Sequence, residues 1–259
     1  MAGSIDRTML NKVPLVTLAF WIIKILATTV GETGADFLNF NMGWGLVATS
    51  AAMTVALVAT LFVQLRQNHY VPWVYWLVVV FLSVVGTLIT DNMSDNLHIS
   101  LYISTALFAA ALAVTFLLWY RSEHTLSIHA ITTTRREAYY WAAILFTFAL
   151  GTAAGDLVSE QMGLGYAISG AIFGGGIALV TLAYFLFGLD AVLAFWIAYI
   201  LTRPLGASIG DFLTQSHKDG GLALGTMQVS GVFLVVIVAL VAFLANTRRD
   251  VEPEPVTSR

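Results

Sequence analysis

Residues 20–36, FWIIKILATTVGETGAD, set the architecture of this chain, because three variants of the same segment follow. They are YWLVVVFLSVVGTLITD at 75–91, YWAAILFTFALGTAAGD at 140–156 and FWIAYILTRPLGASIGD at 195–211. In every copy a Trp stands 15 residues before the final Asp, and a Gly stands 5 before it. The final residues, here called the repeat aspartates, are Asp36, Asp91, Asp156 and Asp211. Their separations of 55, 65 and 55 positions indicate a true internal repeat.

The composition places the chain in a membrane. Of the 259 residues, 58% are hydrophobic and 10% are charged, whereas a soluble domain has roughly 25% charged residues. These values exclude a water-soluble fold, a disordered protein and a nucleic-acid binder. Cysteine is absent, which excludes disulfides, thiolate metal sites and cysteine nucleophiles.

Apolar runs predict the number of spans, since a transmembrane helix needs about 20 mostly apolar residues. Eight such runs occur, at about 14–38, 43–65, 71–92, 97–120, 137–158, 162–188, 191–213 and 222–246. Each repeat therefore holds two helices, and all repeats run in the same direction. We predict an all-α integral membrane protein with eight transmembrane helices built from four parallel two-helix repeats.

The repeats also predict the division of the chain. One membrane domain is expected, with repeats 1 and 2 in residues 1–120 and repeats 3 and 4 in residues 137–247. A cytoplasmic linker at 121–136 joins the halves, and residues 248–259 form a disordered tail. The N-terminal segment lacks the pattern of a cleaved signal, so the first span should remain in the mature protein.

The distribution of charge predicts the orientation. The termini and the loops on their side carry nearly all the Arg and Lys residues, and the other side carries Lys218 and most of the acids. By the positive-inside rule both termini are cytoplasmic. We expect the protein in the bacterial inner membrane, with the repeat aspartates toward the outer side.

Polar residues at four-residue spacing predict a shared face on the odd-numbered helices. The first helix has Lys24, Thr28 and Glu32 below its repeat aspartate, and the seventh has Arg203. The third and fifth helices contribute Ser83, Thr87 and Thr152. Small residues one and five positions before each repeat aspartate form a small-xxx-small pattern that lets helices pack closely. We expect the odd-numbered helices to surround a common axis, with the repeat aspartates at similar depth.

The charges on this face predict a cation. Glu32 and the repeat aspartates outnumber Lys24 and Arg203 by three, so the bundle must take up protons or bind a cation. Lys24 is expected to be a buried counter-ion of Glu32 or of another carboxylate. The helix should kink at Pro204, and Arg203 should contact a carboxylate or a freed carbonyl.

Oxygen ligands favour a hard ion, with Mn²⁺ preferred and Mg²⁺ or Ca²⁺ as alternatives. The predicted metal ligands are Asp36, Asp91, Asp156, Asp211 and Glu32. The predicted pathway residues are Lys24, Thr28, Ser83, Thr87, Thr152 and Arg203. No organic cofactor and no catalytic residue are expected.

Four segments carry a resemblance to a known family: TTVGETGADFL at 28–38, VGTLITD at 85–91, RREAYYWAAILFTFALGTAAGD at 135–156 and TRPLGASIGDFL at 202–213. On these segments the chain resembles a bacterial family of multi-pass proteins labelled "uncharacterised membrane-anchored protein", and the likeness covers all four repeats. The label implies no activity. The acid-plus-glycine repeats are also similar in logic, though not in order, to small manganese and calcium exporters with Glu-x-Gly-Asp motifs.

Together these patterns favour a secondary transporter of a hard divalent cation, with manganese preferred and export the expected direction. A proton-coupled or monovalent-cation transporter is the alternative within the same class. An intramembrane enzyme or a metal-binding accessory protein is the alternative from another class, and the fourfold equivalence of the acids argues against an enzyme. The expected partners are the lipid bilayer, the metal ion, protons as a coupling ion and a second copy of the chain in a homodimer.

Overall fold

The structure, a computed structural model, describes residues 11–251 and contains eight long helices. They are α1 (Leu18–Asp36), α2 (Leu46–Arg66), α3 (Pro72–Asp91), α4 (Leu101–Glu123), α5 (Thr134–Asp156), α6 (Tyr166–Phe187), α7 (Ala191–Thr214) and α8 (Thr226–Thr247). All eight are long and apolar enough to cross a membrane. The predicted all-α membrane fold with eight spans is therefore confirmed.

Several helices begin at residues suited to that position. Thr17, Thr133 and Asp190 accept a hydrogen bond from a backbone N–H in the first turns of α1, α5 and α7. Pro72 opens α3, where its missing N–H is harmless. Helix α7 continues through Pro204 to Thr214, so the proline does not end the helix.

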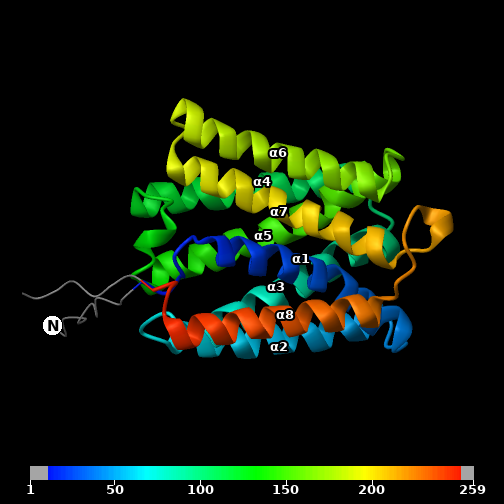
Figure 1. Cartoon of the computed structure of the whole chain (residues 1–259), viewed down its shortest axis with the longest axis horizontal. Helices are drawn as coiled ribbons and strands as arrows, with labels where there is room; N and C mark the ends of the chain where they lie inside the picture. Colours follow the sequence, from blue (N-terminus) through cyan, green and yellow to red (C-terminus); the bar gives the residue numbers. More distant parts are fainter. Residues whose placement is uncertain (1–10, 252–259) are drawn as a thin grey trace, which may run out of the picture.

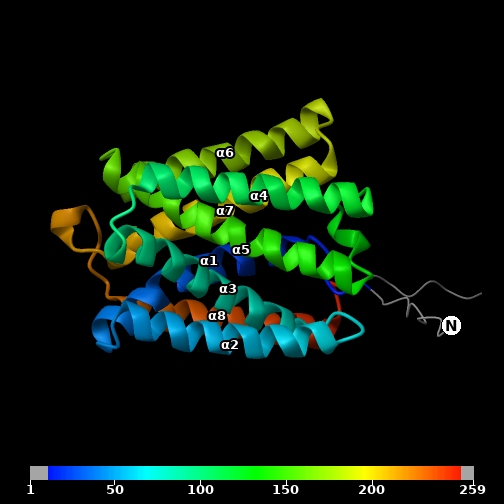
Figure 2. The ribbon, with the colours of Figure 1, turned by 180° about the vertical axis from the view of Figure 1, so that it is seen from behind.

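The odd-numbered helices form a closed central ring. Contacts join α1 to α3, α3 to α5, α5 to α7 and α7 back to α1. The even-numbered helices lie outside this ring, as Figures 1 and 2 show. Each packs against the odd helix of the following repeat: α2 on α3, α4 on α5, α6 on α7, and α8 on α1. The four repeats are thus interlocked in a cycle.

The repeat glycines allow the ring to close. A Cβ atom on Gly31 would collide with Ser83, and one on Gly86 would lie 2.6 Å from Cβ of Phe148. Equivalent collisions join Gly151 to Arg203, and Gly206 to Thr28. In all four pairs, the glycine five residues before one repeat aspartate meets the residue eight before the next. The small-residue pattern therefore serves close helix packing around the whole ring.

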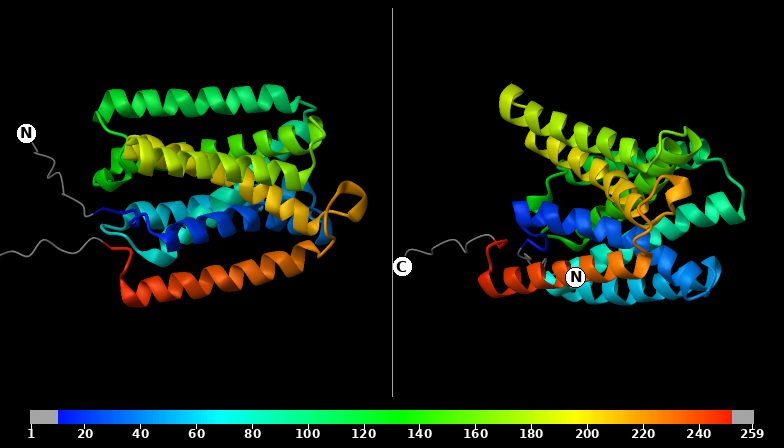
Figure 3. Two further views of the ribbon diagram at one scale, coloured as in Figure 1. Left: turned by 45° about the horizontal axis from the view of Figure 1, so that its top comes forward. Right: turned by 45° about the vertical axis from the view of Figure 1, so that its right-hand side comes forward.

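The aromatic pairs that open the repeats fill the other end of the ring. Phe20 contacts Trp76 and Phe195, and Tyr75 contacts Trp141, with ring centroids 5.4–6.1 Å apart. The hydroxyls of Tyr75 and Tyr140 lie 2.5 Å apart. This aromatic layer and the repeat aspartates mark opposite ends of the odd helices, here called the basic end and the acidic end. Residues 11 and 251 both lie at the basic end (Figures 1 and 3).

Two predicted boundaries were wrong. The linker is shorter than 121–136, because α4 continues to Glu123 and α5 begins at Thr134. It is also packed, since Ile128 and Ile131 are buried and Trp196 donates a hydrogen bond of 2.9 Å to the Leu126 carbonyl. The predicted tail begins too early, because Asp250 is buried and bonded; residues 252–259 lie outside the described part of the chain.

Three repeats share a change of helical form at the acidic end. Directly after Asp36, Asp91 and Asp156 the helix widens into a five-residue π-helical turn. The fourth repeat has no such turn among its described residues; α7 continues to Thr214 as an α-helix. Because π-helical turns recur at functional sites, the acidic end is the part of the ring where a site is most expected.

Candidate functional site

Arg203 lies at the centre of the ring and joins all four repeats. Its side chain is completely buried. It donates hydrogen bonds of 3.0 Å to Glu32 Oε2 and to the Thr28 carbonyl of α1, and it also bonds the hydroxyls of Thr87 on α3 and Thr152 on α5. The expectation that Arg203 contacts a carboxylate or a carbonyl is confirmed.

The repeat explains why these partners meet. Glu32, Thr87 and Thr152 all stand four residues before a repeat aspartate, on three neighbouring helices. Arg203 stands eight before Asp211, and its guanidinium reaches the layer one turn closer to the acidic end. Helix α7, in the fourth repeat, has Ala207 at the equivalent position. This small side chain leaves the centre of that layer to the guanidinium. Divergence at one position has therefore produced a single ion pair among equivalent helices.

Lys24 does not pair with Glu32, so that prediction was wrong. Eight residues, about 12 Å along α1, separate them, which is more than the lysine side chain spans, and Arg203 occupies the place beside Glu32. The Lys24 Nζ atom is buried without a hydrogen-bond partner among residues 11–251. It lies 4.1 Å and 4.2 Å from the ring centroids of Phe148 and Tyr199.

Thr28 and Ser83 hold the helices on either side of Arg203. The Thr28 hydroxyl donates to the carbonyls of Ile25, at 2.7 Å, and Thr202, at 3.3 Å. The Ser83 hydroxyl donates to the Thr28 carbonyl at 3.5 Å. All the predicted pathway residues therefore lie on the inner faces of the ring, within two helical turns of Arg203, and they are buried.

The repeat aspartates gather at the acidic end. Asp36, Asp91 and Asp156 are the last residues of their helices, and Asp211 lies in the last turn of α7. Each stands one helical turn beyond the level of Glu32, Thr87 and Thr152. Within residues 11–251, however, no three His or acidic side chains are close enough to hold one metal ion. The predicted five-carboxylate ligand set is not assembled as a metal site in this structure.

A second ion pair, which the repeat pattern did not reveal, closes the basic end. Lys12 Nζ lies 2.6 Å from Glu137 Oε2, and both side chains are 1% exposed. Gln64 Nε2 donates to the other oxygen of Glu137 at 3.1 Å. Nearby, the Tyr70 hydroxyl donates to Asp250 at 2.7 Å. Glu137 has no acidic counterpart in the other repeats, and it lies at the end of the polar stretch TTTRRE, so the sequence carried no signal that could have distinguished it from a solvated loop residue.

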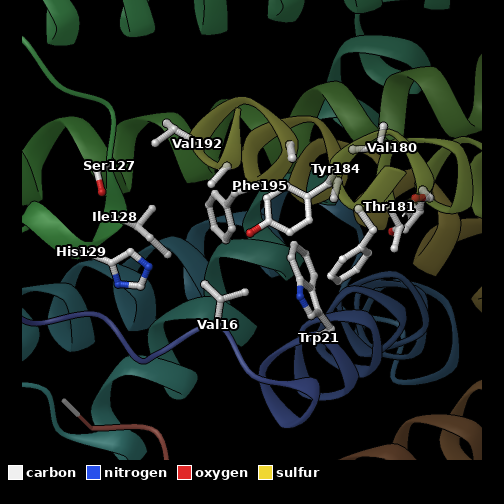
Figure 4. A pocket seen from close by; sticks show the side chains of 15 residues that line it. Val16, Trp21, Ser127, Ile128, His129, Val180, Thr181, Tyr184, Val192 and Phe195 are labelled. Atoms are coloured by element: carbon white, nitrogen blue, oxygen red, sulfur yellow. Dashed lines mark hydrogen bonds between the residues drawn. The ribbon is translucent and has the colours of Figure 1, made fainter. Parts of the chain in front are cut away.

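A mostly apolar pocket lies away from this polar axis. It has a volume of about 480 Å³ and lies between α1, α6 and α7 near the basic end. Its lining is mostly apolar, and Figure 4 shows Trp21, Phe195 and Tyr184 around it. None of the predicted ligands or pathway residues lines it. The site of interest is therefore the axis of the ring, not this flank.

The comparisons agree with the repeat. The family described as "Repeat of Unknown Function (DUF347)" matches the chain four times, at residues 19–70, 74–125, 139–189 and 194–250. Each match covers one odd helix and the even helix that follows it. No curated protein and no solved structure matches the chain significantly.

Proposed function

The chain belongs to the DUF347 repeat family, and from the polar axis of its central ring we propose that the protein is a proton-coupled cation transporter. The observation that carries the proposal is the position of Arg203, which Glu32, Thr87 and Thr152 bind from the three other repeats. Charged residues inside a membrane protein are costly, and they commonly mark an ion pathway. A purely structural bundle of apolar helices gains nothing from such a group.

Protonation of Glu32 is the step that we propose to link protons to helix movement. The carboxylate is the counter-charge of a completely buried guanidinium. Neutralising it leaves Arg203 unpaired in a medium of low dielectric constant, which is strongly unfavourable. Arg203 then moves toward another carboxylate, and the repeat aspartates lie at the acidic end, beyond Glu32. Because Arg203 on α7 bonds the three other repeats, its movement loosens the contacts between the odd helices.

The repeat aspartates have a separate role in this proposal. Several carboxylates around one opening create a negative potential that concentrates cations there. The basic end is meanwhile closed by the Lys12–Glu137 pair and the aromatic layer. We therefore assign this conformation to a state accessible from the acidic end.

The proposal is tested in proteoliposomes that contain a pH-sensitive dye. After an imposed pH gradient, wild-type protein is expected to move protons faster than empty liposomes, and added cations should change the rate. Glu32→Gln keeps the size of the side chain but cannot titrate, so it should abolish proton movement. Replacing any one repeat aspartate by Asn should slow proton movement, because the negative potential that attracts cations to the acidic end weakens.

Asp219→Asn is the matched control, since Asp219 is an exposed acid at the acidic end that lies outside the ring; its flux should equal that of the wild type. Wild-type liposomes that hold the pH gradient as well as empty ones would refute the proposal. Unchanged flux in Glu32→Gln would remove Glu32 from the mechanism.

Export of a hard divalent cation, Mn²⁺ first, is the second candidate. The placement of the repeat aspartates at one end of the ring, one helical turn beyond the level of Glu32, favours it, and all these side chains offer oxygen ligands, which suit Mn²⁺, Mg²⁺ and Ca²⁺. The same liposomes with a metal-sensitive dye decide between the candidates. Metal flux without a pH gradient supports the divalent exporter, whereas proton flux without any metal supports the first proposal.

A further inference from the structure

Lys24 is the one lysine in the middle of a helix, and the structure gives it no acceptor. The chain has three lysines, Lys12, Lys24 and Lys218. Lys12 is paired with Glu137, and Lys218 is exposed. Lys24 is 0% exposed, and its Nζ atom has no hydrogen-bond partner within the described residues. A permanent ammonium in that setting would be strongly unfavourable.

The surroundings of Lys24 suit an amine that is charged only part of the time. The faces of Phe148 and Tyr199 lie about 4 Å from Nζ and stabilise an ammonium through cation–π attraction. The guanidinium of Arg203 is close enough to repel that same charge. One favourable and one unfavourable interaction therefore act on the charged form, and neither is a hydrogen-bonded ion pair.

The titratable groups that interact with Lys24 both come from α7: Tyr199, whose ring lies 4.2 Å from Nζ, and Arg203. On α5 the neighbour of Nζ is the ring of Phe148, which cannot titrate. The hydroxyl pair of Tyr75 on α3 and Tyr140 on α5 belongs to the aromatic layer of the basic end. On α1 itself Glu32 is the nearest acid toward the acidic end, and it is already bonded to Arg203. Helix α8, the outer neighbour of α1, carries no titratable side chain. Within residues 11–251, no carboxylate thus pairs with Lys24.

We propose that Lys24 is a proton-binding site at the middle of the axis and that it carries the coupled proton between the acidic end and the basic end. This inference rests on the proposed proton coupling and names the residue that performs it. The lone pair of the amine accepts a proton that arrives past Glu32, giving an ammonium held between the two rings. The same proton then leaves toward the Tyr75–Tyr140 pair, and the neutral amine returns. No other group is consumed.

Two substitutions separate this role from a structural one. Lys24→Arg keeps a cation that stacks on aromatic rings, but a guanidinium does not release its proton in proteins. Lys24→Met keeps the length and removes the charge. Both variants should lose proton flux in the dye-loaded liposomes. The matched control is Lys218→Arg, an exposed lysine at the acidic end, which should leave the flux unchanged.

A spectroscopic measurement tests the site without relying on transport. In protein labelled with ¹⁵N at the lysine side chains, three signals are expected and can be assigned through the Lys12→Met and Lys218→Met variants. The Lys24 signal should change between its amine and ammonium positions within the pH range in which the protein is folded.

The outcomes are distinct. Wild-type flux in Lys24→Arg, or a Lys24 signal that stays in one form at every pH where the protein is folded, overturns the inference. If wild-type protein moves no protons, the proposed function fails. In that case a Lys24 signal that titrates would still show a buried proton-binding site, but not one that carries a coupled proton. A Lys24 signal that does not titrate would exclude the proton-binding site too.

Discussion

At the residue scale, the Arg203–Glu32 pair is the feature on which the centre of the molecule depends. A buried ion pair is seldom a net source of stability, because two charges lose their water. Removing one partner is far worse, since it leaves the other charge unpaired. Loss of the pair should cost the surrounding hydroxyls less, because Thr87 and Thr152 also donate hydrogen bonds to carbonyls of their own helices at 3.2–3.3 Å.

This asymmetry gives a prediction for Arg203→Met. The single change should destabilise the protein by about 3–5 kcal/mol, because Glu32 is left charged in the core. The double change with Glu32→Met should recover much of that loss while it abolishes proton flux. Thermal unfolding in detergent measures the stability. Arg135→Met, at a side chain that is 69% exposed, is the control and should unfold like the wild type. A double variant less stable than the single would contradict the argument.

At the element scale, close approach of the odd helices depends on glycine, which has no Cβ atom, at one position in each of the four repeats. Each repeat glycine faces the inner side of the next helix, where even a methyl group has no room. The outer helices are different, since α6 buries only three of its residues and carries three consecutive glycines at 174–176. The same residue therefore has different consequences on inner and outer helices.

Gly86→Ala tests this difference. Its Cβ would lie 2.6 Å from Cβ of Phe148, so α3 and α5 must separate, and overpacking of this kind costs about 1–3 kcal/mol. We expect a lower unfolding temperature and weaker proton flux. Gly175→Ala is the matched control, since a Cβ there meets nothing within 4 Å; as a better helix former, alanine should leave the stability equal or slightly higher. Equal unfolding temperatures for both variants would show that the ring is not closely packed at Gly86.

At the scale of the whole molecule, the interlocked repeats place both ends of the described chain on one side. The acidic end carries the π-helical turns and the repeat aspartates, and the basic end carries the Lys12–Glu137 pair. The excess of Arg and Lys at the basic end then predicts that this end faces the cytoplasm.

The absence of cysteine makes this orientation measurable. Single cysteines replacing Lys218 at the acidic end and Arg121 at the basic end should react differently with a membrane-impermeant maleimide. We expect Lys218→Cys to be labelled in intact cells, and Arg121→Cys to be labelled only after the membrane is opened. The cysteine-free parent protein is the control for background labelling. The reverse pattern would invert the orientation, and with it the direction of every transport step proposed above.

Much of this molecule follows from the sequence alone, for a physical reason. The number of spans depends on apolar length, and the place of the repeat aspartates at one end depends on parallel repeats; both are local properties of the chain. The identity of the polar pairs was decided only by the tertiary structure. Glu32 and Arg203 are 171 residues apart, and whether they meet depends on how far each helix is rotated about its axis. Sequence spacing on one helix suggested Lys24 as the partner of Glu32, because it records neighbours along a helix and not across the ring. The Lys12–Glu137 pair was not predicted for the same reason, since it joins a segment before the first helix to the middle of the chain.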